Sequence, residues 1–313
     1  LRHCFDFLFK DKIKCAVDKN SPILVMFVAM ENTHCPICHF SASQPIFDNT
    51  LLKCPKCGHG WANLQLDQAY LQELYAENYF KGEEYADYLA DKEILQLNFA
   101  KRTKQIAAQG RLPKKALEIG CAYGFFYETL KESFPSVSYQ GYDISAAAIS
   151  YANQHFGPHF SADNYLETSS NQTYDAIFMW DVIEHLSDPG AFLAKAQKEC
   201  EPGGMLYLTT GDFGALLPKL QGKKWRMIHP PTHLHYFTQK SMTALLRQHG
   251  FEPVFYKYPP VYRSLRLIYF ALFILNKTPK RFHNWIYERI PKAACIPINT
   301  RDIFFVGAKK ITV

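Results

Sequence analysis

The sequence predicts an α/β fold of the Rossmann-like class, in which helices wind around a largely parallel sheet, preceded by a small cysteine-rich module. Two observations predict the sheet. Short apolar runs typical of buried strands, at 116–119, 175–181 and 205–210, alternate with helical patterns. The first run leads into a glycine turn, 120–124, that opens a helical pattern. A third observation, two closely spaced pairs of cysteines, predicts the module.

The composition agrees with a globular chain that has a sizeable core. Of the 313 residues, 48% are hydrophobic and 20% are charged, which suits one large domain plus a small module. The longest apolar runs, 22–30 and 267–275, are too short to span a bilayer. The composition therefore excludes a disordered chain and predicts no transmembrane segment.

The net charge of +6 is distributed unevenly along the chain. Residues 211–313 contain 17 Lys and Arg against 4 Asp and Glu, whereas residues 1–210 contain 18 against 25. An electropositive carboxyl-terminal third suggests an anionic partner, such as a phosphorylated acceptor, a membrane surface or nucleic acid. Ordinary solubility is the alternative explanation.

Residues 1–29 fit poorly with the chain that follows. A basic opening leads into the apolar stretch 23–29, which is the outline of a signal peptide, but no convincing small-residue cleavage site accompanies it. We expect Met30 to be the natural start and residues 1–29 to be an extension that is not native. Four of the nine cysteines have metal-ligand spacing and the other five are scattered, so we expect a reducing, cytoplasmic location.

Residues 30–63 are predicted to form a zinc ribbon. Cys35 and Cys38 form one C-x2-C pair, and Cys54 and Cys57 form a second pair after fifteen intervening residues. Four thiolates at this spacing can hold one Zn²⁺ in tetrahedral geometry, and a site closed by four sulfurs is structural rather than catalytic. Three histidines are expected at the surface or around the site without ligating the ion: His34, His39 and His59.

Residues 64–110 are predicted to form a helical linker or lid, and residues 111–313 the large domain. Apolar and aromatic side chains recur at helical spacing through the linker, and most of them should pack against the core. Its aromatic part, 75–85, could instead cover a pocket.

The glycine turn has the chemistry of a nucleotide-binding loop. Gly120 and Gly124 let the chain pass close to a ligand, and Asp143, at the end of the next strand, offers two acceptors for ribose hydroxyls. The spacing is G-x-x-x-G rather than the G-x-G-x-x-G of nicotinamide enzymes, which disfavours a dehydrogenase.

These residues resemble a known set of motifs. The stretch from Glu118 to Gly124 resembles the first motif of class I S-adenosylmethionine-dependent methyltransferases, with Ala122 in place of the commoner middle glycine. Residues 174–186, with their D-x-x-E-H ending, resemble the branch that includes ubiquinone-biosynthesis O-methyltransferases, and zinc-containing sugar methyltransferases also pair a small zinc module with this fold. The resemblance implies a seven-stranded methyltransferase sheet and S-adenosylmethionine as the cofactor.

The same resemblance implies the cofactor-binding residues. Asp143 would bind the ribose, and Asp163 and Asn164, after a third strand, would read the adenine amino group. The complete set is Glu118, Gly120, Cys121, Ala122, Tyr123, Gly124, Asp143, Ile144, Asp163, Asn164, Trp180 and Asp181.

Methyl transfer to a hydroxyl or an acidic carbon requires a base near the carboxyl ends of the central strands, and histidine suits this role at neutral pH. The candidates lie in one run: His229, His233 and His235, with Tyr236 as an alternate donor. Two prolines interrupt this run and prevent one helix from presenting His229 and His233 together, which disfavours a metal there. His185, in E-H-L, is expected to have a fixed hydrogen-bonding role.

Residues 213–227 are expected to cover the acceptor. Trp225 could stack on a ring while Lys223, Lys224 and Arg226 hold a phosphate or carboxylate. A solvated loop with one buried tryptophan is the alternative.

A helix is predicted at 238–250, and the last two strands at 251–258 and 302–309. The insertion between these strands, 259–300, contains the apolar stretch 265–275 flanked by cations. We rank packing in the core or in a dimer first for this stretch, and contact with a membrane interface second.

The function implied is methyl transfer from S-adenosylmethionine to a small or carrier-linked acceptor, such as a sugar nucleotide, a glycolipid precursor or a quinone-like hydroxyl. The enzyme would be cytoplasmic or peripheral to the membrane, as a monomer or homodimer. An RNA methyltransferase that binds through the zinc ribbon and the basic carboxyl-terminal third is the principal alternative. A zinc-ribbon adaptor with a vestigial Rossmann-like domain is the non-enzymatic one.

Overall fold

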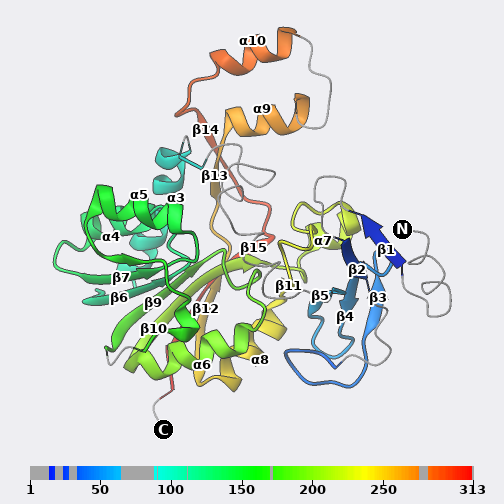
Figure 1. The fold of residues 1–313 in the computed structure, drawn as a ribbon, viewed down its shortest axis with the longest axis horizontal. Coiled ribbons are helices and arrows are strands. Elements are labelled where there is room, and N and C mark those ends of the chain that lie inside the picture. Colours follow the sequence, from blue (N-terminus) through cyan, green and yellow to red (C-terminus); the bar gives the residue numbers. More distant parts are fainter. Residues whose placement is uncertain are drawn as a thin grey trace.

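The computed structural model describes residues 14–17, 24–27, 34–64, 88–89, 91–110, 112–169, 172–274 and 281–311. They form a seven-stranded sheet with helices on both faces, a smaller four-stranded sheet, and a two-stranded stem that carries two helices (Figure 1). A separate hairpin pairs β1 (Lys14–Val17) with β2 (Leu24–Phe27). The described residues do not test two expectations: the origin of residues 1–29, and the helix or pocket cover expected over 65–87.

The large sheet is the α/β sheet that the sequence predicts. Its strands are β6 (Lys115–Ile119), β7 (Ser138–Tyr142), β8 (Phe160–Ser161), β9 (Tyr174–Trp180), β10 (Cys200–Gly211), β12 (Phe251–Lys257) and β15 (Ile303–Lys310). They lie in the order β12-β15-β10-β9-β6-β7-β8. The five strands from β10 to β8 are parallel, and β15 is antiparallel to both β10 and β12. The fold class is therefore confirmed, and the last two strands are neighbours.

The sheet is buried on both faces, which explains why its strands are continuous apolar runs. Successive side chains of a strand point to opposite faces. In β9, Ile177 and Met179 enter one core, while Phe178 and Trp180 enter the other. One core is covered by α6 and α8, and the other by α3, α4 and α5 (Figure 1).

The helices begin where the sequence provides capping side chains. The side chains of Ser145, Asp188 and Thr238 each accept a backbone N–H from the first turn of the helix that follows. The helices are α3 (Lys92–Ala107), α4 (Phe125–Ser133), α5 (Ala146–Phe156), α6 (Pro189–Glu199), α7 (Leu216–Gln221) and α8 (Gln239–Gln248), with short 3-10 turns η2 (Tyr165–Glu167) and η3 (Gly222–Lys224). The helix expected at 238–250 is confirmed.

The cysteine-rich module is joined to the large domain by a shared sheet. Its strands β3 (Gln44–Ile46), β4 (Leu51–Lys53) and β5 (Gly60–Ala62) continue into β11 (His235–Tyr236), which comes from the histidine run of the large domain. Pairing of β5 with β11 places Trp61 opposite His235. Cys35, Cys54 and Trp61 belong to the same core as Phe237, so the module is packed onto the domain rather than tethered to it.

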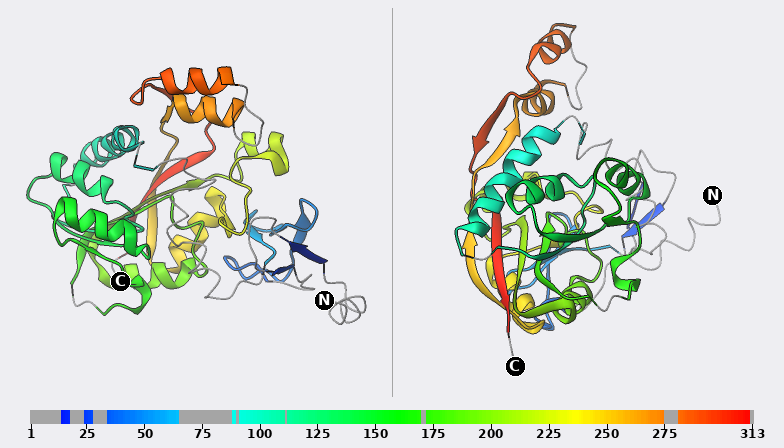
Figure 2. Two further views of the ribbon diagram at one scale, coloured as in Figure 1. Left: turned by 45° about the horizontal axis from the view of Figure 1, so that its top comes forward. Right: turned by 90° about the vertical axis from the view of Figure 1, so that its left-hand side faces the viewer.

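The insertion 259–300 forms a stem and a helical hairpin. The stem pairs β13 (Val261–Ser264) with β14 (Cys295–Ile298), and its far end carries α9 (Leu265–Phe273) and α10 (Arg281–Arg289). The hairpin projects away from the sheet (Figure 2). The expectation that this stretch packs in the core is wrong, because no described side chain of either helix is buried. In the described part of the chain, no helix is long and apolar enough to cross a membrane.

Candidate active site

The carboxyl ends of β6, β7, β9 and β10 meet at one edge of the sheet, where open α/β sheets bind ligands. We call this the ligand edge. The loops that leave it carry most of the residues singled out in the sequence.

The glycine loop after β6 is shaped by close contacts. Gly120 has φ +79°, and a Cβ at this position would lie 2.3 Å from Val182 Cγ2 in the loop after β9. Gly124, at the start of α4, has φ +77°, and a Cβ there would lie 2.8 Å from Phe160 Cζ. Ala122 also has a positive φ of 45°, the backbone conformation that explains why glycine is commoner at this position in the family. Only glycine fits Gly120 and Gly124 without strain.

Asp143, after β7, holds this loop in place. One carboxylate oxygen accepts the N–H of Ala122 at 2.9 Å, and the other accepts the N–H of Ser145 at 2.9 Å. Burial raises the pKa of Asp143, and the two N–H donors oppose that rise. Each oxygen keeps acceptor capacity for a further hydroxyl. Ile144, next in the chain, has an exposed side chain beside this carboxylate.

Glu118, at the end of β6, is buried and accepts a hydrogen bond from the Tyr139 hydroxyl of β7. Burial raises the pKa of Glu118 to about 8. A ligand cation beside this carboxyl would favour its ionised form. Cys121 is buried against Gly141, and the Tyr123 ring stacks on Tyr88 at 5.5 Å.

The carboxyl end of β9 carries Trp180 and Asp181. The Arg102 guanidinium of α3 lies 4.9 Å from the centre of the Trp180 ring and 3.4 Å from the Asp181 carboxylate. Asp181 has φ +55°, and its N–H donates to Thr209 of β10. Arg102 therefore links the end of β9 to α3, a contact that the sequence did not reveal because α3 lies far from β9 in the chain.

Asp163 and Asn164 follow β8 at the far side of the ligand edge. Asp163 is exposed and accepts a hydrogen bond from Ser161 at 2.5 Å. Asn164 accepts the N–H of Leu166 and donates to Glu167. Asn164 thereby fixes the short helical turn that follows.

Three histidines cluster beside the loop after β9. The His185 and His233 rings are 4.5 Å apart, and the His233 and His229 rings are 3.8 Å apart. Each ring uses Nδ1 in a hydrogen bond: His185 with the Thr232 carbonyl, His233 with the Met227 carbonyl, and His229 with the Thr232 hydroxyl. These hydrogen bonds use Nδ1 of each ring and so fix the orientation of the ring. Thr232, which organises two of the rings, was not identified from the sequence.

Glu184 completes this cluster and was missed by the sequence reasoning, which considered only the local run of histidines. Its carboxylate is buried, and ligand atoms of Glu184, His185 and His233 all lie within 4.8 Å of one another. A buried carboxyl group is either protonated or, when ionised, balanced by a positive charge such as a divalent cation. Tertiary contact therefore creates a potential metal-ligand set that differs from the pair His229 and His233 considered in the sequence.

The histidine run is attached directly to the loop after β9. The Glu184 carbonyl accepts the N–H groups of both Leu234 and His235, at 2.8 and 3.0 Å. Burial, together with the neighbouring His185 and His229, holds the pKa of His233 well below its usual value. His233 is therefore neutral at physiological pH, which is the form of histidine that can act as a base, while the lowered pKa weakens it as a proton acceptor.

The other two candidates in the run have structural partners. The His235 ring is buried and lies with Nδ1 3.1 Å from Nε2 of His59, in the cysteine-rich module. The Tyr236 hydroxyl donates to the His233 carbonyl at 3.0 Å. Both residues lie in β11 of the shared sheet, and Tyr236 contacts His233 directly.

Trp225 is not available to stack on a ligand. It is buried, and its indole N–H donates to Asp302 at 2.7 Å, beside an ion pair between Arg226 and Asp302. Lys223 pairs with Asp48 of the cysteine-rich module. The expectation of a stacking tryptophan is wrong, and the alternative of one buried tryptophan is what the structure contains.

The four cysteines have the arrangement of a tetrahedral metal site. Cys35 and Cys57 sulfurs lie 3.6 Å apart, Cys38 and Cys54 sulfurs lie 3.5 Å apart, and all four lie within 4.8 Å of one another. Tetrahedral zinc–thiolate geometry requires sulfurs about 3.8 Å apart. The donor set therefore fits Zn²⁺. His34 and His39 are exposed, as expected, whereas His59 is fully buried between the module and the large domain.

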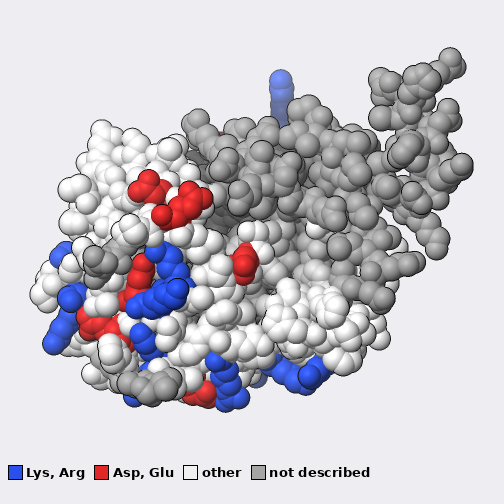
Figure 3. Space-filling model, turned by 60° about the horizontal axis from the view of Figure 1, so that its bottom comes forward, with Lys and Arg blue, Asp and Glu red and all other residues white. Residues whose placement is uncertain are grey.

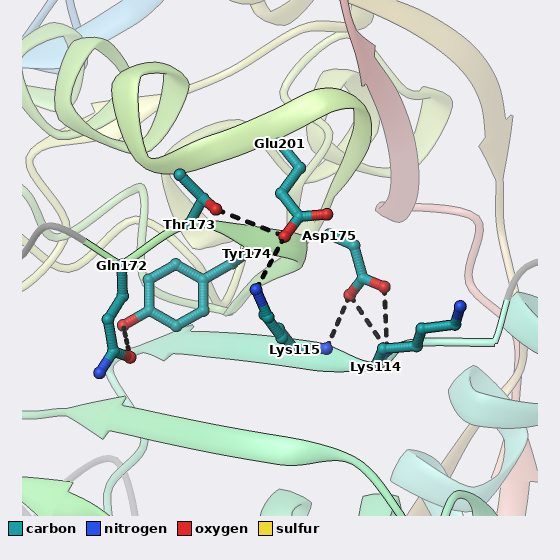
Figure 4. Close-up of polar contacts among 7 residues, drawn as sticks. All are labelled: Lys114, Lys115, Gln172, Thr173, Tyr174, Asp175 and Glu201. Atoms are coloured by element: carbon teal, nitrogen blue, oxygen red, sulfur yellow. Dashed lines mark hydrogen bonds and ion pairs between the residues drawn. The ribbon is translucent and has the colours of Figure 1, made fainter.

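A hollow of about 210 Å³ lies at the opposite edge of the sheet, at the amino ends of β6 and β9. Its polar groups are already paired: the Asp175 carboxylate accepts the N–H groups of Lys114 and Lys115, and the Lys115 ammonium pairs with Glu201 (Figure 4). These contacts hold the strand ends together. They offer no reactive group, so the chemistry belongs at the ligand edge.

Comparison with known proteins assigns the class. Residues 91–255, more than half of the chain, match the family described as "Methyltransferase domain", and the chain belongs to that family. Residues 91–255 are therefore a methyltransferase domain of the S-adenosylmethionine-dependent class.

Two curated relatives are O-methyltransferases. The chain is 31% identical over 142 residues to malonyl-[acyl-carrier protein] O-methyltransferase of Hahella chejuensis, covering 42% of this chain and 48% of that protein. It is 26% identical over 187 residues to ubiquinone biosynthesis O-methyltransferase of Pasteurella multocida, covering 49% of this chain and 76% of that protein. The chain thus spans about half the length of the first relative.

One solved structure shows the same fold. The Haloferax volcanii complex of the Trm112 methyltransferase activator with a methyltransferase aligns with a TM-score of 0.50 at 12% identity, over 79% of this chain and 100% of that chain. At this identity the likeness is one of fold alone.

Proposed function

We propose that the protein methylates a hydroxyl or an acidic carbon of a small or carrier-linked acceptor, with His233 as the general base. The observation that carries the proposal is the contact between Gly120 and Val182. This contact joins the glycine loop to the loop after β9, which contains Glu184 and His185. That second loop contacts the histidine run through the Glu184 carbonyl and through the His185 ring, which lies against His233. The base is thereby next to the loop that would bind the methyl donor.

S-adenosylmethionine supplies an electrophilic methyl group when bound. The glycine loop would lie against the bound cofactor, and Asp143 would accept hydrogen bonds from the ribose hydroxyls of the cofactor. Glu118 would face the positive charge of the cofactor. Asp163 and Asn164 would recognise the adenine amino group. The remaining proposed contacts are Cys121, Ala122, Tyr123, Ile144, Trp180 and Asp181, with Gly120 and Gly124 forming the turn.

The acceptor side would remove one proton as the methyl group is transferred. The acceptor O–H or C–H bond breaks, the proton passes to His233, and the electron pair forms the new bond to the methyl carbon while the sulfur keeps the electrons of the broken S–C bond. His229 is the adjacent ring through which that proton can leave. In this proposal His235 and Tyr236 position His233 and are not bases.

The acceptor class is supported by the relatives. Their names include a malonyl group on acyl-carrier protein and intermediates of ubiquinone biosynthesis. We therefore favour a carrier-linked or quinone-like acceptor, with sugar nucleotides and glycolipid precursors as further candidates.

The cysteine-rich module is proposed to be a zinc ribbon with Cys35, Cys38, Cys54 and Cys57 as ligands. Zn²⁺ would supply structural stability to the three short strands of the module. Because β5 pairs with β11, the ribbon would also keep the histidine run in place.

The test is a His233→Asn variant, compared with His155→Asn, an exposed histidine on α5 that serves as the control. Formation of S-adenosylhomocysteine would be measured with quinol and carrier-protein acceptors. We expect His233→Asn to lower kcat by about 10²- to 10⁴-fold, as removal of a general base does. An unchanged kcat would remove His233 from the mechanism.

A further inference from the structure

The helical hairpin of α9 and α10 emerges at the ligand edge. Strand β12 is antiparallel to β15, and β15 is antiparallel to β10, so β12 is parallel to β10. The carboxyl end of β12 therefore lies at the same edge as those of β6, β9 and β10. The chain continues from this end into the stem, which places the hairpin on the side where substrates enter.

The stem is fixed to the body of the enzyme. The Asn98 side chain of α3 accepts the N–H of Tyr262 at 2.8 Å and donates to its carbonyl at 3.1 Å. The Lys101 ammonium lies 4.1 Å from the centre of the Tyr262 ring. The orientation of the hairpin is thus set relative to the ligand edge.

One face of α10 is used to pack against α9. The Tyr269 hydroxyl is 2.8 Å from the His283 ring nitrogen, the Phe273 ring stacks on His283, and the Arg266 guanidinium lies over the Tyr287 ring at 4.5 Å. These contacts satisfy the face of α10 that contains His283 and Tyr287.

A different face of α10 is apolar and exposed. Phe282 and Trp285, three residues apart on the helix, are 62% and 53% exposed, and their rings stack at 6.2 Å. Arg289, one turn further, places its guanidinium 3.9 Å from the centre of the Trp285 ring. Leu272 and Phe273 at the end of α9 are also exposed. More than half of the Phe282 and Trp285 side chains is therefore open to solvent.

The insertion also carries the entire net charge of the protein. Residues 259–300 contain seven of the 35 Lys and Arg but one of the 29 Asp and Glu, which leaves 28 of each in the remainder. On the described part of the face shown in Figure 3, charges of both signs are interspersed. The hairpin, by contrast, combines exposed aromatic side chains with excess positive charge.

We propose that the α9–α10 hairpin is a peripheral membrane anchor that inserts Phe282 and Trp285 into the interface of an anionic lipid surface. Aromatic side chains favour the depth of the lipid headgroups, and surrounding cations attract anionic lipids. A protein partner or a second copy would explain the apolar face but does not require the positive charge. Nucleic acid would explain the charge but not the exposed Phe282 and Leu272.

The anchor has a consequence for catalysis. Because the stem leaves the ligand edge and is fixed to α3, a hairpin bound to a membrane holds that edge close to the lipid headgroups. An acceptor embedded in the membrane or carried at its surface could then reach the histidine cluster without leaving the membrane. The anchor itself does not depend on the identity of the methyl acceptor.

Sedimentation with vesicles tests the anchor. The purified enzyme would be mixed with vesicles that contain phosphatidylglycerol and, separately, with vesicles of phosphatidylcholine alone. Each mixture would be tested at low and at high salt. We expect binding to the phosphatidylglycerol vesicles at low salt, and loss of about tenfold or more in affinity for the double variant Phe282→Ala and Trp285→Ala. Leu112→Ala, at an equally exposed site near the opposite edge of the sheet, is the matched control and should bind as the wild type does.

Three results would overturn the proposal. The first is a folded wild type that does not sediment with anionic vesicles at low salt. The second is a double variant that binds vesicles as well as the wild type. The third is a wild type that does not bind vesicles but does self-associate or bind RNA, with the self-association or RNA binding lost in the double variant. Binding of S-adenosylhomocysteine should be unchanged in the variant and confirms that it is folded.

Discussion

The two halves of the ligand edge are built in different ways. The half proposed to bind the cofactor consists of loops after β6, β7 and β8, where short-range contacts such as that between Asp143 and Ala122 predominate. The acceptor half is assembled from the loop after β9, the histidine run and the cysteine-rich module, with His59 and His235 in contact across 176 positions of the sequence. The cofactor half is therefore locally encoded, whereas the acceptor half depends on long-range contacts.

This difference predicts that removing the metal proposed for the cysteine site damages the acceptor half selectively. In a Cys54→Ser variant, or after chelation, we expect the module to unfold, because a structural zinc site supplies several kcal/mol of folding free energy. Loss of β5 would release β11 and the histidine run, so turnover should fall to background while S-adenosylhomocysteine still binds. Metal content, calorimetry and turnover on the same sample test this. Full turnover without metal would contradict it.

Substitution at Gly120 should damage the cofactor half instead. In Gly120→Ala the new Cβ would collide with Val182, and the positive φ adds strain, for a combined cost of about 2 to 5 kcal/mol. Gly110→Ala is the matched control, since its φ is +73° but nothing lies within 4 Å of the added Cβ. We expect the control to lose only about 1 to 2 kcal/mol of unfolding free energy, measured with denaturant. Equal losses would show that the contact with Val182 is unimportant.

A smaller effect concerns the pH dependence of stability at His235, where the histidine run contacts His59 of the cysteine-rich module. Burial lowers the pKa of His235 to about 4, so the folded protein binds this proton less readily than the unfolded chain does. The sign follows from linkage: stability is lost as the pH falls from about 6.5 toward 4, where the unfolded chain is protonated and the folded one is not. His235→Gln should flatten this part of the stability profile, measured by thermal unfolding. An unchanged slope would mean that other groups cause it.

The sequence predicted where the glycine loop and Asp143 lie in the fold because that information is local. Gly120, Gly124 and Asp143 each follow a strand at a fixed interval, so a strand pattern and a residue type were enough to place them at one edge. The helix at 238–250 was likewise predicted from local start and stop signals. The roles of the cofactor-binding residues nevertheless remain predictions.

The acceptor half could not be predicted to the same extent. No local pattern relates Glu184 to His233 or Arg102 to Trp180, because these contacts depend on how distant segments pack. The same limit explains the error at Trp225, whose partner Asp302 is 77 positions away. It also explains the insertion: an apolar stretch such as 265–275 suggests full burial, whereas the described side chains of α9 are only partly buried or exposed because the stem carries the helix away from the sheet.

Binding of S-adenosylhomocysteine to the wild type, Gly120→Ala and His233→Asn, measured by calorimetry alongside turnover, tests the separation of the two halves most directly. The account predicts that Gly120→Ala loses affinity by about tenfold or more, in line with the strain at the glycine loop. It predicts that His233→Asn binds within about twofold of the wild type while losing turnover. Loss of affinity in His233→Asn as large as in Gly120→Ala, or wild-type affinity in Gly120→Ala, would contradict the account.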